Sequence, residues 1–245
     1  MLVRGELDVA NLYFPNFLRQ RAQDAPIVGL STEWKSTAKG NGMFVRRDAG
    51  IGSPKDLEGR LVASHQGVHR FHPYLLRRAF GVDDTTLRWV ARPQGELLGT
   101  LLSGEVDAAV LLDQFFVLGA ESSELTCLYT DGDAWQKVSG FDEMIKHMIA
   151  VKQSLLDENP GIKERLLRGF RESFAYSEAH LEEVAHAFTH IYGGDREALM
   201  TSARYPRIEF TFTPRELAIA TAEVTMLVET GLLDDTVDVG PLFAV

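Results

Sequence analysis

The amino-acid sequence predicts an α/β fold built from two similar lobes, and three observations lead to this prediction. Residues 2–13 resemble residues 101–112, and each copy is typical of a helix end, a glycine and a short apolar strand. Between residues 61 and 112, predicted strands alternate with helices, which indicates parallel strand pairing. After Lys152 the apolar spacing becomes that of helices.

The repeated motif places a glycine, Gly5 or Gly104, where a helix is expected to end. Glycine suits this position because it has no Cβ to oppose a positive φ. Asp8 and Asp107 stand at the starts of the strands that follow, where we expect them to accept hydrogen bonds rather than to catalyse. Chance similarity between two helix–strand junctions is the alternative explanation.

The first part of the chain predicts three strands and one helix. A strand over 7–13 is followed by a short helix over 15–23, which has Pro15 near its start. Apolar runs at 26–31 and 42–47 predict the next two strands.

The central block is the most regular part of the pattern. It predicts, in order, a strand over 61–64, a helix near 73–80, a strand over 87–90, a helix over 94–102 and a strand over 106–112. Further strands are expected over 125–129 and 144–151.

The last hundred residues predict helices with apolar residues on one face. The segment 213–216, Thr-Pro-Arg-Glu, is a good helix start, and Gly231 is a plausible residue just beyond that helix. The expected helices cover 160–177, 180–192, 196–203 and 214–230.

The composition excludes several classes of protein. A hydrophobic content of 45% with 24% charged residues is typical of a globular chain, and a net charge of −10 argues against nucleic-acid binding. Cys127 is the single cysteine, so neither a disulfide framework nor a cysteine zinc site is expected. No apolar run approaches the ~20 residues of a membrane span, and no signal peptide is evident. We therefore expect a cytoplasmic protein if Met1 is the true start. If an upstream signal is missing, we expect a periplasmic or membrane-anchored extracytoplasmic one.

Four segments, 5–10, 53–62, 104–109 and 149–160, resemble the nitrate/sulfonate/taurine-type solute-binding proteins of ABC transporters and the related thiamine-pyrimidine-precursor family. The resemblance implies a two-lobed type II periplasmic-binding-protein fold that closes on a small ligand in the cleft between the lobes. The family opens with a strand and a helix, and we expect this sequence to lack both.

The resemblance also implies how the lobes divide the chain. Lobe I is expected to comprise residues 1–48 and 142–245, and lobe II residues 49–141. The thiamine-precursor enzymes carry a cysteine-rich metal motif, and a chain with one cysteine does not have that chemistry.

A narrower resemblance concerns residues 139–148 and the terminal pair 242–243. These are similar to the 4,5-dihydroxyphthalate decarboxylase-like branch of the same fold, in which His147 would match a histidine of the returning strand. The residues before His147 match only loosely.

The strongest candidate for ligand binding is the polar segment that follows the strand 61–64 and leads into a helix. Ligands of open α/β sheets bind at such strand ends, and free N–H groups at a helix start favour an anion. Here the backbone at Gly67 allows close approach, Arg70 is suited to a carboxylate or sulfonate, and Ser64 and Gln66 are suited to orient it. An ordinary solvated loop is the alternative.

Three histidines of this segment, His65, His69 and His72, also suit a metal because spacings of four and three share a helix face. Pro73 disfavours helical geometry at His72, and no nearby carboxylate completes a ligand set. We therefore predict that His65 and His69 contact a ligand and that no metal or other cofactor is bound.

Other candidate ligand contacts follow from their place at predicted strand ends. Aromatic rings there would stack on a planar ligand, and a lysine would add positive charge. For each of them, core packing or an exposed turn is the alternative. These residues are Tyr13, Trp34, Lys35, Asp113, Gln114 and His147.

Three functions are compatible with these patterns. The first is a solute-binding protein that captures a small carboxylate or sulfonate and delivers it to an ABC transporter permease. The second is an aromatic-acid decarboxylase, and the third is a truncated product that binds nothing. An exposed sheet edge at 7–13 would also permit a homodimer.

Overall fold

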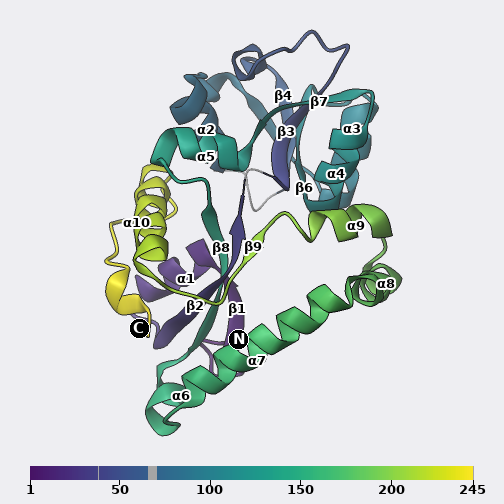
Figure 1. The fold of residues 1–245 in the computed structure, drawn as a ribbon. Helices are drawn as coiled ribbons and strands as arrows, with labels where there is room; N and C mark the ends of the chain where they lie inside the picture. The colour runs from purple at the N-terminus through teal and green to yellow at the C-terminus, as the bar shows by residue number, and fades with distance from the viewer. Residues whose placement is uncertain (38, 66–70, 245) are drawn as a thin grey trace. The chain divides into compact units, whose positions relative to one another are not determined.

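The computed structural model describes residues 1–37, 39–65 and 71–244, and it confirms the α/β fold with two separate sheets (Figure 1). The chain divides into two compact units. Unit 1 comprises Met1–Lys35, Met144–Val184 and Arg207–Val245, and unit 2 comprises Ser36–Glu143 and Ala185–Pro206.

These bounds differ from the predicted lobes at residues 36–48, 142–143 and 185–206. Residues 36–48 belong to unit 2 because the strand β3 (Asn41–Arg46) pairs on both sides within the sheet of that unit. Residues 185–206 also belong to unit 2, because the helix α9 (Arg196–Ser202) packs against α4 (Asp113–Glu121). Local patterns do not show such long-range packing.

Unit 2 is built on a five-stranded mixed sheet. β4 is parallel to both of its neighbours, β5 and β6, whereas β3 is antiparallel to β6 and β7. The carboxyl ends of the other four strands therefore share one edge of the sheet. In spatial order the strands are β5 (Arg88–Ala91), β4 (Leu61–Ser64), β6 (Ala108–Leu112), β3 and β7 (Leu125–Thr130).

Helices cover both faces of this sheet, as an α/β unit requires. Figure 1 shows α2 (Phe71–Phe80) and α5 (Asp131–Ser139) on one face, and α3 (Gln94–Leu102) and α4 on the other. The core beneath α3 and α4 is formed by buried residues that include Phe44, Leu97 and Phe116.

Unit 1 contains a four-stranded sheet with the order β1, β8, β2, β9. β1 (Val9–Tyr13) is an edge strand, antiparallel to β8 (Met144–Lys152), with Tyr13 opposite His147. β9 (Arg207–Ile208) pairs antiparallel with the end of β2 (Ile27–Ser36), at Trp34 and Lys35.

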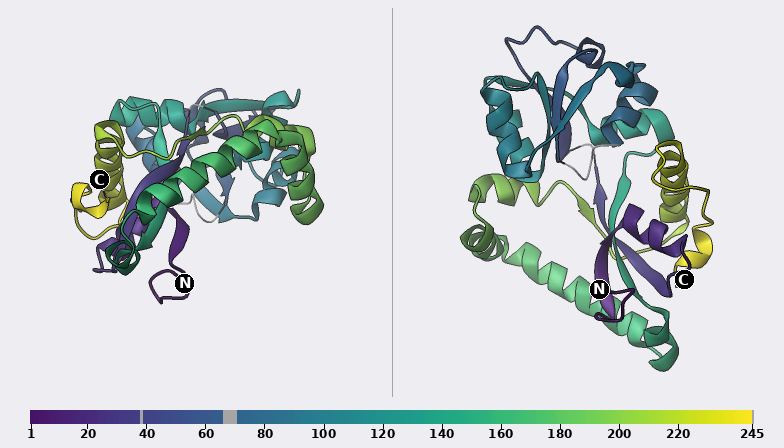
Figure 2. Two further views of the ribbon diagram at one scale, coloured as in Figure 1. Left: turned by 60° about the horizontal axis from the view of Figure 1, so that its bottom comes forward. Right: turned by 180° about the vertical axis from the view of Figure 1, so that it is seen from behind.

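The helices of unit 1 shield this sheet (Figure 2). α1 (Phe14–Arg21) and α10 (Pro214–Glu229) pack against β8, and α6 (Gln153–Glu158) leads into α7 (Ile162–Ala179). Leu167 of α7 shares a core cluster with Val28 of β2 and Ile149 of β8. α8 (Leu181–Tyr192) follows, and in the described parts of the chain no helix is long and apolar enough to cross a membrane.

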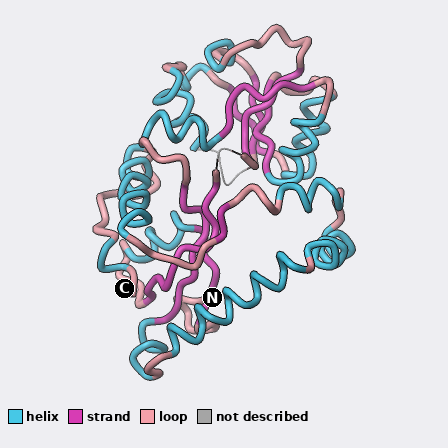
Figure 3. The backbone as a smooth tube through the Cα atoms, in the orientation of Figure 1, coloured by secondary structure: helices cyan, strands magenta, loops and turns pink. Residues whose placement is uncertain are grey.

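The alternation of strands and helices through unit 2 can be followed in Figure 3. Most predicted elements are present within a few residues of their expected ends, and α3 has the predicted bounds. The strand predicted over 26–31 extends to Ser36 because β9 pairs with its end. Local spacing did not predict α4, α5, α6 or β9.

The glycines of the repeated motif adopt the predicted left-handed conformation, with φ of 78° at Gly5 and 79° at Gly104. Gly231, beyond α10, does so too, with φ of 65°. As expected, Asp107 accepts a hydrogen bond from the Leu61 amide (2.8 Å), and Asp8 binds the Lys152 ammonium (2.8 Å). The two aspartates therefore fix strand ends.

The glycine requirement at the repeated motif can be tested by Gly104→Ala. The added Cβ meets the Arg46 side chain at an ordinary contact distance of 3.4 Å, so the cost comes from the positive φ. We expect a loss of about 1–2 kcal/mol in the free energy of unfolding in urea. Gly99→Ala, in α3 with nothing within 4 Å of the new Cβ, is the control and should stabilise by about 0.5–1 kcal/mol. Equal changes in the free energy of unfolding for the two variants would contradict the need for glycine at position 104.

Candidate functional site

Three predicted ligand contacts come together in unit 1, although they lie on different strands. Tyr13 ends β1, Trp34 lies in β2, and His147 lies in β8. The His147 ring centroid lies 5.3 Å from that of Trp34 and 6.0 Å from that of Tyr13, the latter in an edge-to-face arrangement. All three side chains are half-buried, so the cluster offers ring surface to a ligand.

Two polar residues that sequence reasoning missed hold His147 in place. The Asn11 amide oxygen, Oδ1, accepts a hydrogen bond from Nδ1 of the ring over 2.9 Å, and Asn11 Nδ2 donates to the Glu33 carboxylate. Burial raises the pKa of Glu33, whereas burial and then the nearby Lys146 charge lower the pKa of His147. Asn11 and Glu33 lie next to strand residues already singled out, but only strand pairing shows that they meet.

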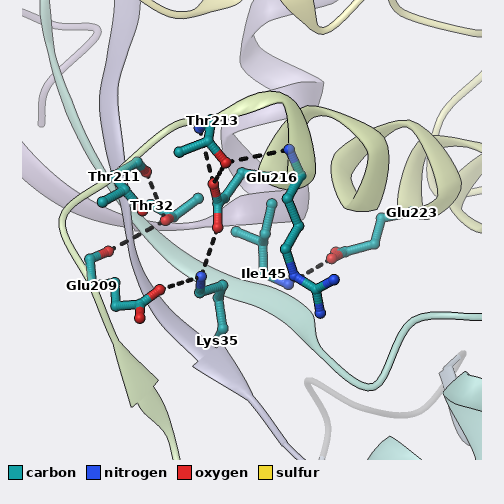
Figure 4. A network of polar contacts seen from close by, with 9 residues as sticks. Thr32, Lys35, Ile145, Glu209, Thr211, Thr213, Glu216 and Glu223 are labelled. Carbon is teal, nitrogen blue, oxygen red and sulfur yellow. Dashed lines mark hydrogen bonds and ion pairs between the residues drawn. The ribbon is translucent and has the colours of Figure 1, made fainter.

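Lys35 does not have the predicted role of a free charge at a strand end. It lies inside β2, its side chain is 1% exposed, and its ammonium binds Glu209 (2.8 Å) and Glu216 (2.7 Å) (Figure 4). The prediction failed because β9 and α10, which supply the strand partner and the carboxylates, are distant in sequence.

Glu216 joins this ion pair to the start of α10. As predicted, Thr213 caps the helix, and the Glu216 carboxylate accepts from the Thr213 amide (2.9 Å) and hydroxyl (2.5 Å) in a capping box (Figure 4). Burial alone would raise the pKa of Glu216, but the hydrogen bonds from Lys35 and Thr213 lower it to about 2. Its stabilising effect is present above pH 4.5 and is lost as the pH falls towards 2.

A second acidic group of α10, Glu223, is 1% exposed and accepts a hydrogen bond from the Ile145 amide of β8 (2.5 Å; Figure 4). Burial raises the pKa of Glu223 to about 8, and neither this hydrogen bond nor the Lys146 charge compensates. The protonated carboxyl is therefore the form that the folded state favours at neutral pH.

In unit 2, predicted residues gather at the edge where the strands β4, β5 and β6 end. Ser64 ends β4, is fully buried, and its hydroxyl has no hydrogen-bond partner in the described part of the chain. β5 and β6 flank β4, and their ends are joined by a hydrogen bond from Gln94 to the Asp113 carboxylate (3.1 Å). This edge is where ligands bind in open α/β sheets.

Asp113 begins α4 with a φ of 51°, and its amide donates to the Gly40 carbonyl (2.8 Å). A positive φ outside glycine costs about 1–3 kcal/mol and is a feature of functional positions. Gln114, in contrast, is used within unit 2, since its Oε1 accepts from the Asp195 amide (3.1 Å) and lies against Gly194.

The histidine segment is described only in part. Gln66, Gly67, His69 and Arg70 lie outside the described residues, and His65 is exposed after β4.

His72 lies in the first turn of α2, contrary to the sequence prediction, because the first turn tolerates Pro73. It is buried, with Nδ1 3.1 Å from the Tyr129 hydroxyl and Nε2 3.6 Å from the Asp131 carboxylate. Sequence reasoning missed Tyr129, near the end of β7, and Asp131, the first residue of α5. Among the described residues no group of three or more His, Cys, Asp or Glu side chains suits a metal ion.

Comparison with known proteins shows the family. The model of the NMT1/THI5-like family matches residues 1–184, so the chain belongs to that family. No curated protein matches the sequence.

The solved structures with the same fold include solute-binding proteins and also an enzyme, the desulfurization enzyme DSZB, with a TM-score of 0.68 and 13% identity, covering 100% of this chain and 84% of its own. The periplasmic aliphatic sulphonate-binding protein SsuA of Escherichia coli has a TM-score of 0.77 and 17% identity, covering 99% of this chain and 77% of its own. The alkanesulfonate-binding SsuA of Xanthomonas axonopodis, bound to MOPS, has a TM-score of 0.72 and 13% identity, covering 99% of this chain and 82% of its own. The ligand-binding component of an ABC-type import system from Staphylococcus aureus, with zinc bound, has a TM-score of 0.67 and 14% identity, covering 95% of this chain and 77% of its own. The type II periplasmic-binding-protein fold predicted from the sequence is thus confirmed, and none of these four proteins is described as a decarboxylase.

The buried ion pair can be tested by Lys35→Met. The substitution leaves the Glu216 carboxylate, only 4% exposed, without its cation, so we expect a loss of about 3–5 kcal/mol in the free energy of unfolding. The matched control is Glu209→Gln, which removes the partner that is 47% exposed and should cost less than about 1 kcal/mol. Similar losses in the free energy of unfolding of the two variants, measured in urea, would show that the buried pair contributes no more to stability than the exposed one.

Glu223 should make stability depend on pH. Its pKa is about 8 in the folded chain against 4.5 as the ordinary value, so its stabilising contribution is full below pH 4.5 and declines as the pH rises through 8. Glu223→Gln keeps an acceptor for the Ile145 amide and removes the titration. Urea unfolding at about three pH values between ~5 and ~9 should show that the free energy of unfolding of the parent chain declines as the pH rises, whereas that of the variant does not. Parallel pH profiles would refute this assignment.

Proposed function

We propose that this protein is a solute-binding protein that captures a small planar organic anion, a carboxylate or a sulfonate, for an ABC-type importer. The observation that carries the proposal is the cluster of Tyr13, Trp34 and His147, where three strands bring predicted contact residues within ring-contact distance. The family and the fold shared with sulphonate-binding proteins support it.

The sheet edge of unit 2 supports the same function by a separate route. The buried Ser64 hydroxyl lacks a partner among the described residues, and a buried hydroxyl is stabilised once a ligand completes its hydrogen bond. Directly after the neighbouring strand β6, Asp113 has a positive φ of 51°, a strained conformation that is a feature of functional sites. We propose this edge as a second ligand-contacting surface, described within unit 2 alone.

Delivery to a permease and an extracytoplasmic location belong to the same proposal, because the similar Escherichia coli protein is periplasmic. A homodimer through β1 is a separate proposal. It rests on the position of this strand at the edge of its sheet, where unpaired N–H and C=O groups favour strand addition.

Binding can be tested by a thermal-shift screen followed by calorimetry with benzenesulfonate, 4-hydroxybenzenesulfonate, benzoate and MOPS. A true ligand at 100 times its Kd should stabilise the fold by ~2.7 kcal/mol. Trp34→Ala should weaken binding about tenfold or more, because it removes ring surface from the cluster.

The control is Tyr192→Ala, which removes an aromatic side chain that is 73% exposed on α8 and should leave the Kd unchanged. Mass spectrometry of the recovered ligand should show it intact. A panel without any binder, equal Kd values for Trp34→Ala and the parent chain, or consumption of the ligand would each count against the proposal.

A further inference from the structure

We infer that Glu33 and Asn11 act as positioning residues that fix the tautomer of His147, so that the ring presents a hydrogen-bond acceptor, Nε2, to a ligand that carries a hydroxyl or N–H donor. This inference rests on the proposed function and narrows its ligand class. It follows from a chain of contacts within unit 1, from Glu33 through Asn11 to His147.

The chain begins at Glu33, which fixes the orientation of the Asn11 amide. A carboxylate only accepts hydrogen bonds, so the atom of Asn11 that faces it must be Nδ2, which donates to Glu33 Oε2. The opposite orientation would place the amide oxygen against the carboxylate, with no proton between them. The amide oxygen Oδ1 is consequently directed away from Glu33 and towards His147.

The orientation of Asn11 then fixes the proton on His147. Nδ1 of the ring lies 2.9 Å from Asn11 Oδ1, which is an acceptor, so Nδ1 must carry the proton and donate it. In a neutral imidazole the other nitrogen, Nε2, then holds a free lone pair. Burial and the Lys146 charge lower the pKa of His147, which keeps the ring neutral at physiological pH.

Nε2 is left available to a ligand. Apart from the contact with Asn11, His147 makes only ring contacts with Tyr13 and Trp34 among the described residues, and the side chain is half-buried. Sulfonate and carboxylate oxygens are acceptors only, so neither group satisfies Nε2. A ligand that fits must carry, besides its anionic group, a phenolic hydroxyl, amine or ring N–H that reaches His147 while its plane lies against the aromatic rings.

The tautomer can be measured without any ligand by ¹⁵N NMR of the histidine side chains at pH 7.5 (about one unit above an ordinary histidine pKa). We expect the His147 signals of a ring protonated on Nδ1. Asn11→Leu, which removes the acceptor from an exposed strand position, should shift the ring towards the Nε2–H form. Glu33→Gln, which keeps an acceptor oxygen for Asn11 Nδ2, should retain Nδ1–H. A ring protonated on Nε2 in the parent chain, or unchanged in Asn11→Leu, would overturn the inference.

The ligand requirement is tested with two probes that differ by one donor, 4-hydroxybenzenesulfonate and benzenesulfonate. In the parent chain we expect the hydroxylated probe to bind about tenfold more tightly, as one completed hydrogen bond allows. Asn11→Leu should reduce this ratio to about threefold or less and leave the Kd of benzenesulfonate unchanged. A merely structural role for Asn11 would weaken both probes equally and would overturn the inference.

Binding and NMR test the proposed function and the positioning role separately. If neither probe binds, the proposed function fails for this ligand class, and the donor requirement fails with it. The NMR result stands apart from binding: an Nδ1–H ring that depends on Asn11 supports the positioning role, and a ring that does not depend on it refutes that role.

Discussion

The buried ammonium of Lys35 is the constraint on which the geometry of unit 1 depends. It joins β2 to Glu209, which follows β9, and to Glu216 in the first turn of α10. Since a buried charge is costly without partners, these three elements must come together in one arrangement. Trp34, the neighbour of Lys35 in β2, is placed by the same strand pairing, and the aromatic cluster depends on it.

In unit 2 the order of the strands brings the candidate site residues together. Its sheet aligns the ends of parallel strands, so that Ser64 and Asp113 arrive at one edge. The Gln94–Asp113 hydrogen bond holds the ends of β5 and β6 beside β4. Fold and site are therefore coupled, because the strand order that buries the core also collects the polar groups.

The sequence predicted those parts that local spacing controls. The left-handed conformation of Gly104, the capping box at Thr213 and the bounds of α3 all follow from a few neighbouring residues. It did not predict the burial of Lys35 or the relay through Asn11, because both depend on partners brought near by strand pairing. Tyr13, Trp34 and His147 were found as candidates from their places on strands, yet only the register of β1 on β8 shows that they meet.

The discontinuous course of unit 1 has a consequence for how the chain is made. Unit 2 draws most of its residues from one unbroken stretch, whereas unit 1 needs the segment from Arg207 onwards. On the ribosome, Lys35 emerges long before Glu209 and Glu216, so its ammonium stays hydrated and β2 lacks its strand partner until residues 207–216 have been made. Translation therefore supplies every strand of the unit 2 sheet by Thr130, well before the last strand of the unit 1 sheet, β9.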